Sequence, residues 1–328
     1  MQKADDWQPS ATLQALRERA ELLATARRFF AQRDVLEVET PVLCANSVTD
    51  PYVASIATRN AAPCDWLRTS PEYHMKRLLA AGSGDIYQIG KAFRHGEVGP
   101  RHQPEFTMLE WYRLDAGLGD LIKECCQLII ELSAPLSAPV TGFRLLSYRE
   151  AFMQHAGIDP LTATTEEICR TVSRQPETGS LEALQSQLGD DRSAWLDLLA
   201  SHTVHPALTG DELWVIHSYP ASQAMLARLN PNDETLAERC EIFCRGVELA
   251  NGFRELTDAE EQRRRFDEDN RTRAMLSAPV IQPDQRLLAA LTHGLPECAG
   301  IAVGLDRVLM TCSGQPDIGA AISFRPGH

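Results

Sequence analysis

Side chains that could bind a cation alternate along residues 105–112, Glu-Phe-Thr-Met-Leu-Glu-Trp-Tyr. In a strand, successive side chains point to opposite sides of the sheet. One face would then carry Phe106, Met108, Glu110 and Tyr112. A carboxylate and a phenol beside an aromatic ring make a poor apolar core but a suitable pocket floor for a cationic ligand. A sheet face open to water explains this pattern equally well.

Two acidic residues lie in a predicted β-hairpin within residues 238–255. Arg-Gly at 245–246 fits a two-residue turn, which would set Phe243 opposite Glu248. Glu241 would then share a face with Glu248 and lie diagonal to it. Two neighbouring carboxylates repel unless a cation lies between them, and oxygen ligands favour Mg²⁺ shared with substrate phosphates. Taken alone, the pattern favours a solvated acidic hairpin over a metal site.

The same hairpin ends in a third acidic residue, Glu255. Plain alternation sends Glu255 to the face opposite Glu248. A pocket that contains both carboxylates therefore requires a break in the strand. We expect that break at Asn251-Gly252.

The segment 300–307, Gly-Ile-Ala-Val-Gly-Leu-Asp-Arg, predicts an apolar strand that enters a helix. Gly304, just before the helix, would let a ligand approach the backbone closely. Arg307, at the start of the helix, could reach a phosphate group. A core strand followed by an amphipathic helix also accounts for this segment.

The periodicity of the remaining sequence predicts the elements that must position these residues. Apolar residues at helical spacing predict helices over about 12–32, 72–81, 118–133, 147–156, 259–277 and 283–293. Alternating or apolar runs predict strands at 35–40, 67–69, 86–94, 105–113, 214–219, 238–255 and from 300 onward. The strands at 86–94 and 105–113 would form a long-looped antiparallel hairpin. The expected fold is α+β, a mainly antiparallel sheet flanked by helices. Residues 160–210 are interpreted as a helical insertion in one domain spanning 1–328.

Composition excludes several classes of protein. The chain has 328 residues, 44% of them hydrophobic, and a net charge of −13, which argues against a broad basic face for nucleic acid. Its nine cysteines include no Cys-x-x-Cys pair, so neither a disulfide framework nor structural zinc is expected. The first ten residues are polar and the apolar runs are short, so we expect a cytoplasmic protein with no signal peptide and no membrane span. P-loop and dinucleotide-binding glycine motifs are absent.

Several segments together resemble the class II aminoacyl-tRNA synthetases. Their three motifs are matched in order by Pro41 after a helix and strand, by Phe93-Arg94 with the loop to Thr107, and by Gly-Leu-Asp-Arg at 304–307. The segments 69–78, TSPEYHMKRL, and 248–258, ELANGFRELTD, resemble lysyl-tRNA synthetase in particular. The fold implied is the class II catalytic domain.

Lysyl-tRNA synthetases carry an N-terminal OB-fold anticodon domain before the first motif. Here the helix of the first motif begins within the first twenty residues. The chain therefore resembles the elongation factor P lysine ligase family, a paralogue of lysyl-tRNA synthetase. Its members activate (R)-β-lysine with ATP and transfer it to a lysine side chain of elongation factor P. Glu-Trp-Tyr-Arg at 110–113 resembles that family's version of the second motif.

The resemblance implies an ATP and Mg²⁺ site. Arg94 would bind the α-phosphate and the activated carboxylate, and would offset the charge that builds up during adenylation. Phe106 would stack on adenine, and Arg307 would lie on the other face of the base. Glu241 and Glu248 would hold Mg²⁺. The further ATP-binding residues implied are His95, Gly96, Glu97, Gln103, Leu249 and Gly304.

The resemblance also implies an amino-acid site. Tyr112 and Glu255 would bind the distal ammonium of the substrate, and Glu72 and Glu110 the nearer amine. The further substrate-binding residues implied are Ser70, Pro71, Asn251 and Ala302. Ala302 stands where lysyl-tRNA synthetases usually have glycine, which would reshape the pocket for a β-amino acid.

Three positions depart from the family's second motif, one of them Pro100, in a loop where a basic residue is common. The motif usually reads Phe-Arg-x-Glu, but the sequence here is Phe-Arg-His-Gly-Glu, so the ATP-contacting role of the acid is assigned to Glu97. Gln103 replaces the usual asparagine and keeps an amide on a longer side chain.

The partners implied are elongation factor P, (R)-β-lysine and a second copy of the chain in a homodimer, without stable tRNA binding. Two alternatives stay open. One is a stand-alone lysine or amino-acid ligase that acts on a small molecule or tRNA. The other is a non-catalytic paralogue. Retention of Arg94, Glu241, Glu248 and Arg307 speaks against the second alternative, because a binding module has no use for all four.

Overall fold

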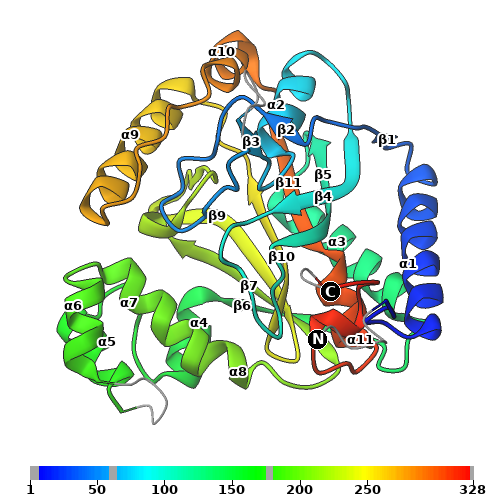
Figure 1. Ribbon diagram of the computed structural model, residues 1–328. Coiled ribbons are helices and arrows are strands. Elements are labelled where there is room, and N and C mark those ends of the chain that lie inside the picture. Colours follow the sequence, from blue (N-terminus) through cyan, green and yellow to red (C-terminus); the bar gives the residue numbers. More distant parts are fainter. Residues whose placement is uncertain (1–6, 59–64, 175–179, 326–328) are drawn as a thin grey trace. The chain divides into compact units, whose positions relative to one another are not determined.

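A computed structural model describes residues 7–58, 65–174 and 180–325 (Figure 1). Residues 1–6, part of the N-terminal stretch in which no signal peptide is expected, and Cys64 lie outside this description. The chain divides into two compact units, residues 1–139 with 255–328, and residues 140–254. Within the described ranges, no helix is long and apolar enough to cross a membrane.

The first unit contains an antiparallel core of strands. β1 (Leu36–Glu37), β4 (Ile86–Phe93), β5 (Glu105–Leu114) and β11 (Cys298–Gly304) are neighbours in that order. β4 and β5 form the predicted antiparallel hairpin, in which Ile86 pairs with Tyr112 and Phe93 with Glu105. β5 also pairs with β11 in antiparallel orientation, and only β1 runs parallel to its neighbour β4. A separate small sheet joins β2 (Leu43–Cys44) to β3 (Trp66–Leu67).

The helices of the first unit agree closely with the sequence periodicity. They are α1 (Leu13–Ala31), α2 (Glu72–Ala80), α3 (Leu118–Ser133), α9 (Ala259–Met275), α10 (Gln285–Gly294) and α11 (Leu305–Cys312). α1 begins after Thr12, whose Oγ1 accepts a hydrogen bond from the Ala15 amide at 3.1 Å. On its buried face the ring of Phe30 stacks on Tyr87 with centroids 4.4 Å apart. This contact fixes α1 against β4.

The second unit contains another set of strands. β10 (Val247–Arg254), β9 (Asp233–Cys244), β7 (Glu212–Pro220) and β6 (Gly142–Ser147) are neighbours in that order, and β8 (Leu229–Asn230) pairs with β9. β10, β9 and β7 are antiparallel, whereas β6 runs parallel to β7. β6 was not predicted from the sequence.

Helices of the second unit include those expected at residues 160–210. They are α4 (Tyr148–His155), α5 (Thr165–Val172), α6 (Leu181–Leu188), α7 (Arg192–Leu199) and α8 (His205–Ala207), with a short π-helical turn between the last two. Trp195 of α7 is fully buried in an apolar cluster with Phe152 and Phe243. The single-domain organisation of residues 1–328 stays a prediction.

Candidate functional site

The proposed pocket floor on β5 is buried. Glu110 is 3% exposed and Tyr112 2% exposed, so the interpretation of this face as open to water is wrong. The Tyr112 hydroxyl donates a hydrogen bond to Oε1 of Glu110 at 2.6 Å. The phenol and the carboxylate, two residues apart on one strand, therefore act as one polar group.

Two further carboxylates hold one ammonium near this pair. Nζ of Lys76 on α2 lies 2.7 Å from Oε1 of Glu72, one helical turn earlier, and 2.6 Å from Oε2 of Glu255. Although that ion pair is short, neither oxygen of Glu255 has a hydrogen-bond partner of good geometry in the described structure. Glu72, Glu110 and Glu255 against Lys76 leave two negative charges in excess when all four groups are ionised. A ligand with two cationic groups would balance that charge.

Burial and mutual repulsion raise the pKa values of these acids. Burial, together with the negative charge of Glu72, raises the pKa of Glu110 to about 8. Burial also raises the pKa of the Glu255 carboxyl to about 7, although Lys76 acts in the opposite direction. Burial alone would lower the pKa of Lys76, but Glu255 and Glu72 raise it above its usual value. Lys76 is therefore charged. The negative charge of the carboxylates that Lys76 does not neutralise is left for a ligand to balance.

β11 closes one side of this cluster with small residues. Gly300 pairs with Tyr112, and Ala302 pairs with Glu110. A Cβ atom at Gly300 would lie 2.3 Å from Cε1 of Tyr112 and 2.6 Å from Oε1 of Glu255. Only glycine therefore lets the phenol and the carboxylate come this close to the strand. Ala302, directly opposite Glu110, adds one methyl group at the floor of the cluster.

The residues assigned to ATP by resemblance gather at the other end of β5. The guanidinium carbon of Arg94 lies 5.2 Å from the centroid of the Phe106 ring. Its Nη1 is 3.5 Å from Oε1 of Glu97, so the displaced acid of the motif does lie beside the arginine. Nε of Arg94 is buried and has no hydrogen-bond partner in the described structure. His95 and Gly96 are exposed in the loop that follows.

Gly304 and Arg307 lie where β11 passes into α11. Gly304 occupies the N-cap position of α11 and pairs with Met108 on β5. Nε of Arg307 donates a hydrogen bond to the carbonyl of Arg101 at 3.3 Å, which connects the third motif to the loop of the second. Gln103 in that loop is 7% exposed. The motif residues assigned to ATP in the first unit therefore gather at one end of the β5–β11 pair, where β5 begins and β11 ends.

The acidic hairpin of the second unit has the predicted turn. Arg245 and Gly246 both have positive φ, 49° and 72°, and Glu248 pairs with Phe243. The strand break, however, is not at Asn251-Gly252. The register shifts between Glu248 and Ala250, so the extra residue is Leu249.

This bulge brings three oxygen-bearing side chains to one face of the hairpin. Beyond it Asn251 pairs with Glu241, so Asn251 and Glu248 share the face of Glu241 although they are three residues apart. Oδ1 of Asn251 is buried without a hydrogen-bond partner in the described structure. Glu241 forms an ion pair with Arg239, whose guanidinium also stacks on Tyr219. Leu249 is 2% exposed, so its side chain is not available to a ligand.

These donors fit a magnesium ion that is shared with phosphate groups. Two carboxylates and an amide oxygen are the hard ligands that Mg²⁺ prefers. Among the described residues, no group of three or more His, Cys, Asp or Glu side chains could hold a metal ion alone. The hairpin therefore offers part of a coordination shell, which phosphate oxygens would complete.

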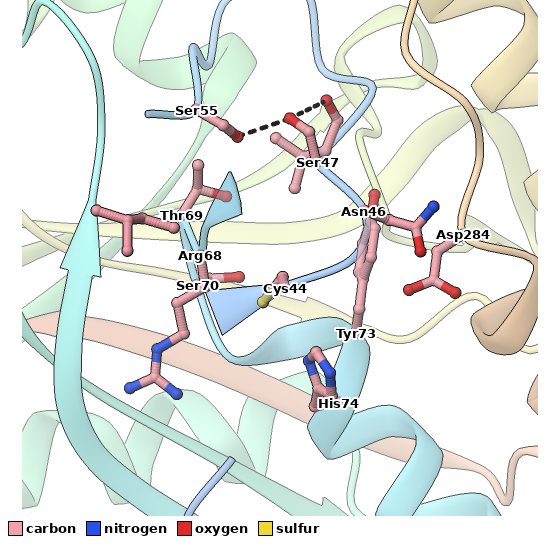
Figure 2. A pocket seen from close by; sticks show the side chains of 12 residues that line it. Cys44, Asn46, Ser47, Ser55, Arg68, Thr69, Ser70, Tyr73, His74 and Asp284 are labelled. Carbon is pink, nitrogen blue, oxygen red and sulfur yellow. Dashed lines mark hydrogen bonds between the residues drawn. The ribbon is translucent and has the colours of Figure 1, made fainter. Parts of the chain in front are cut away.

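A small cavity lies at the start of α2 (Figure 2). Its volume is about 20 Å³, enough for one water molecule. Figure 2 shows Ser47 and Ser55 at one end, where their hydroxyl groups are hydrogen-bonded at 2.7 Å. Of the predicted substrate-binding residues only Ser70 lines it. Ser70 also accepts a hydrogen bond from the Glu72 amide at 3.3 Å, one position before the N-cap Pro71.

Two residues at the acidic cluster, which comprises Glu72, Glu110, Tyr112 and Glu255 around Lys76, were not predicted from the sequence. Lys76 lies in the segment 69–78 that resembles lysyl-tRNA synthetase. Its spacing of four residues from Glu72 is the signal that both side chains lie on one face of α2. Gly300 was predicted only as the start of a strand, and its contact with Tyr112 depends on the register of β5 and β11.

Comparison with known proteins places the chain in a family. The family model for class II tRNA synthetases (D, K and N) matches residues 4–326. A protein of Photorhabdus laumondii named elongation factor P--(R)-beta-lysine ligase is 44% identical over 330 residues, 99% of this chain and 98% of the relative. Proteins of the same name from Pectobacterium carotovorum and Histophilus somni are each 43% identical, and the matches cover 99% and 98% of this chain and 98% and 97% of the relatives. The chain therefore belongs to the class II tRNA synthetase family of the D, K and N type, among the relatives named elongation factor P--(R)-beta-lysine ligase.

Proposed function

We propose that this chain is an ATP-dependent, AMP-forming ligase that activates (R)-β-lysine and transfers it to a lysine side chain of elongation factor P. The observation that carries the proposal is the acidic cluster around Lys76. Its excess of two negative charges matches the two ammonium groups of a lysine isomer. The names of the relatives supply the identity of the substrate and acceptor.

The proposed reaction has two steps. The substrate carboxylate attacks the α-phosphorus of ATP, and pyrophosphate leaves as the aminoacyl-adenylate forms. The neutral amine of the acceptor lysine then attacks the carbonyl carbon, AMP leaves, and the amine loses its proton as the amide forms. The chain needs no covalent intermediate of its own, because positioning and charge stabilisation suffice.

Each group of residues has a part in this scheme. Arg94, whose buried Nε has no hydrogen-bond partner in the described structure, would bind the α-phosphate and the attacking carboxylate. Phe106 and Arg307 would hold adenine. Glu241, Glu248 and Asn251 would bind Mg²⁺, which would offset the charge of the triphosphate. We further propose a homodimer in the cytoplasm that binds no tRNA stably.

The test is mass spectrometry of elongation factor P after incubation with the chain, ATP, Mg²⁺ and equal amounts of α-lysine and (R)-β-lysine. We expect one added lysyl residue, taken from the β isomer. Pyrophosphate exchange without a product on elongation factor P would instead support a ligase with another acceptor. No exchange with any amino acid would support a non-catalytic paralogue.

The raised carboxyl pKa values predict that amino-acid binding strengthens as pH rises from 6 to 8. In the free chain Glu110 and Glu255 have pKa values of about 8 and about 7, so both are partly protonated at neutral pH. A dicationic ligand favours the ionised acids, so binding releases protons. Each proton released makes the dissociation constant fall by about tenfold per pH unit below these pKa values.

Calorimetry with (R)-β-lysine, in two buffers of different ionisation enthalpy, would count the protons. Glu110→Gln should remove part of the pH dependence, whereas Glu260→Gln, an exposed residue in the first turn of α9, should leave it unchanged. A dissociation constant that does not vary between pH 6 and 8 would contradict this account of the cluster.

A further inference from the structure

Arg19 on α1 connects the two segments that would hold adenine. Its Nη1 donates a hydrogen bond to Oδ1 of Asp306 at 2.5 Å, and its Nη2 donates to Oγ1 of Thr107 at 2.6 Å. Thr107 directly follows Phe106 on β5, and Asp306 directly precedes Arg307 on α11. None of the sequence motifs assigns a role to Arg19.

Arg19, Asp306 and Thr107 form a triangle of hydrogen bonds, and its third side joins Asp306 to Thr107. Oδ2 of Asp306 accepts a hydrogen bond from the Thr107 backbone amide at 2.7 Å. The pairing of β11 with β5 ends at Gly304 and Met108, so the carboxylate of Asp306 continues the connection where the strand ladder stops. Arg19, Thr107 and Asp306 are thus each bonded to the other two.

The triangle is buried, which makes its geometry costly to change. Asp306 is 2% exposed and Thr107 5% exposed, and the Arg19 side chain is 16% exposed. An ionised carboxylate this deep requires a cation and hydrogen-bond donors. The planar guanidinium supplies two donors at fixed separation, which a single ammonium cannot do.

We propose that Arg19 is a positioning residue of the nucleotide site. It sets the distance between Phe106 and Arg307 through Thr107 and Asp306, and so prepares the gap in which adenine binds. The inference rests on the proposed function only in taking ATP as the ligand. It assigns to the first helix a part in nucleotide binding that is separate from the amino-acid cluster around Lys76.

The test is direct ATP binding by calorimetry, which does not depend on turnover. Arg19→Gln should weaken ATP binding by about tenfold or more, because a buried charged hydrogen-bond pair loses one partner. Arg19→Lys should fall between Arg19→Gln and the natural chain. The dissociation constant for (R)-β-lysine should change less than about twofold, since the amine cluster contains none of these residues.

Thr107→Val is a second variant, which removes a single hydrogen bond with little change of shape and should weaken ATP binding about threefold. Arg28→Gln is the matched control on the exposed side of α1, where Arg28 pairs, among the residues that the structure describes, only with side chains of the same helix. ATP affinity in Arg19→Gln equal to that of Arg28→Gln would overturn the inference. A parallel loss of ATP and (R)-β-lysine binding with a lower melting temperature would also overturn it, because it would show a purely structural role. Absence of ligation by the natural chain, with normal ATP binding, would count against the proposed function alone.

Discussion

Arg94→Ala should lower the rate of ATP–pyrophosphate exchange by about 10²–10³-fold, the loss typical of removing a donor that stabilises a transition state. The side chain has the features of such a donor. Its buried Nε has no partner in the described structure, and its one ion pair, with Glu97, is long at 3.5 Å. The side chain of Arg94 therefore has donor capacity left for a ligand and contributes little to the fold. We expect kcat to fall while the melting temperature stays nearly constant.

Lys91→Ala provides the control for this variant. Lys91 lies on β4, three residues before Arg94. Its side chain is 45% exposed and pairs at 3.2 Å with the similarly exposed Glu105. Surface pairs of this kind contribute about 0–1 kcal/mol, so neither exchange nor stability should change much. An exchange rate in Arg94→Ala within threefold of that in Lys91→Ala would remove Arg94 from the proposed mechanism.

Glu255→Gln should lower kcat/KM for (R)-β-lysine by about 100-fold, since truncating one partner of a buried charge pair costs about 2–5 kcal/mol. The amide keeps the shape of the carboxylate but halves the excess negative charge of the cluster, from two to one. KM for ATP should change little, because Phe106 and Gly304 of the proposed nucleotide site lie at the other end of the β5–β11 pair. Glu260→Gln again serves as the exposed control.

A substrate analogue separates this effect from a folding defect. (R)-3-aminohexanoic acid lacks the distal ammonium that Glu255 is proposed to bind. The natural chain should strongly prefer (R)-β-lysine, and Glu255→Gln should lose most of that preference. An equal loss of activity toward both compounds would mean that Glu255 supports the structure and does not recognise the distal amine.

The sequence predicted the fold best where one strong periodic pattern decides the local structure. The helix at 118–133 is confirmed to the residue, and the Arg245-Gly246 turn is confirmed with the predicted pairing of Glu248. Strands that depend on a distant neighbour were predicted less well. The strand expected at 35–40 is only Leu36–Glu37, and β6 at 142–147 was missed, because each is a parallel edge strand whose pairing the local sequence does not encode.

The candidate site was predicted through its motifs and not through its packing. Glu72, Glu110, Tyr112 and Glu255 do come together in the first unit, but the cation among them, Lys76, was not expected. Lysine is almost always exposed, so nothing in its identity suggests burial. Arg19 was missed for a related reason, since its partners lie 88 and 287 residues away along the chain. Glu241 and Glu248 share a face as the metal assignment requires, and Asn251, which was predicted to bind the substrate, lies on the same face. These roles stay predictions.

The bulge at Leu249 also determines which changes of length this strand can accept. Leu249 is one residue more than the pairing of β10 with β9 needs, because Glu248 and Ala250 already face the consecutive residues Phe243 and Ile242. A deletion at this position can therefore be absorbed by straightening the strand, which leaves Asn251 opposite Glu241. An inserted residue cannot be accommodated by straightening the strand. It would turn the side chains of Asn251 and Phe253 to the other side of the sheet. Variation among natural relatives should accordingly include shorter forms of this hairpin strand, but not longer ones.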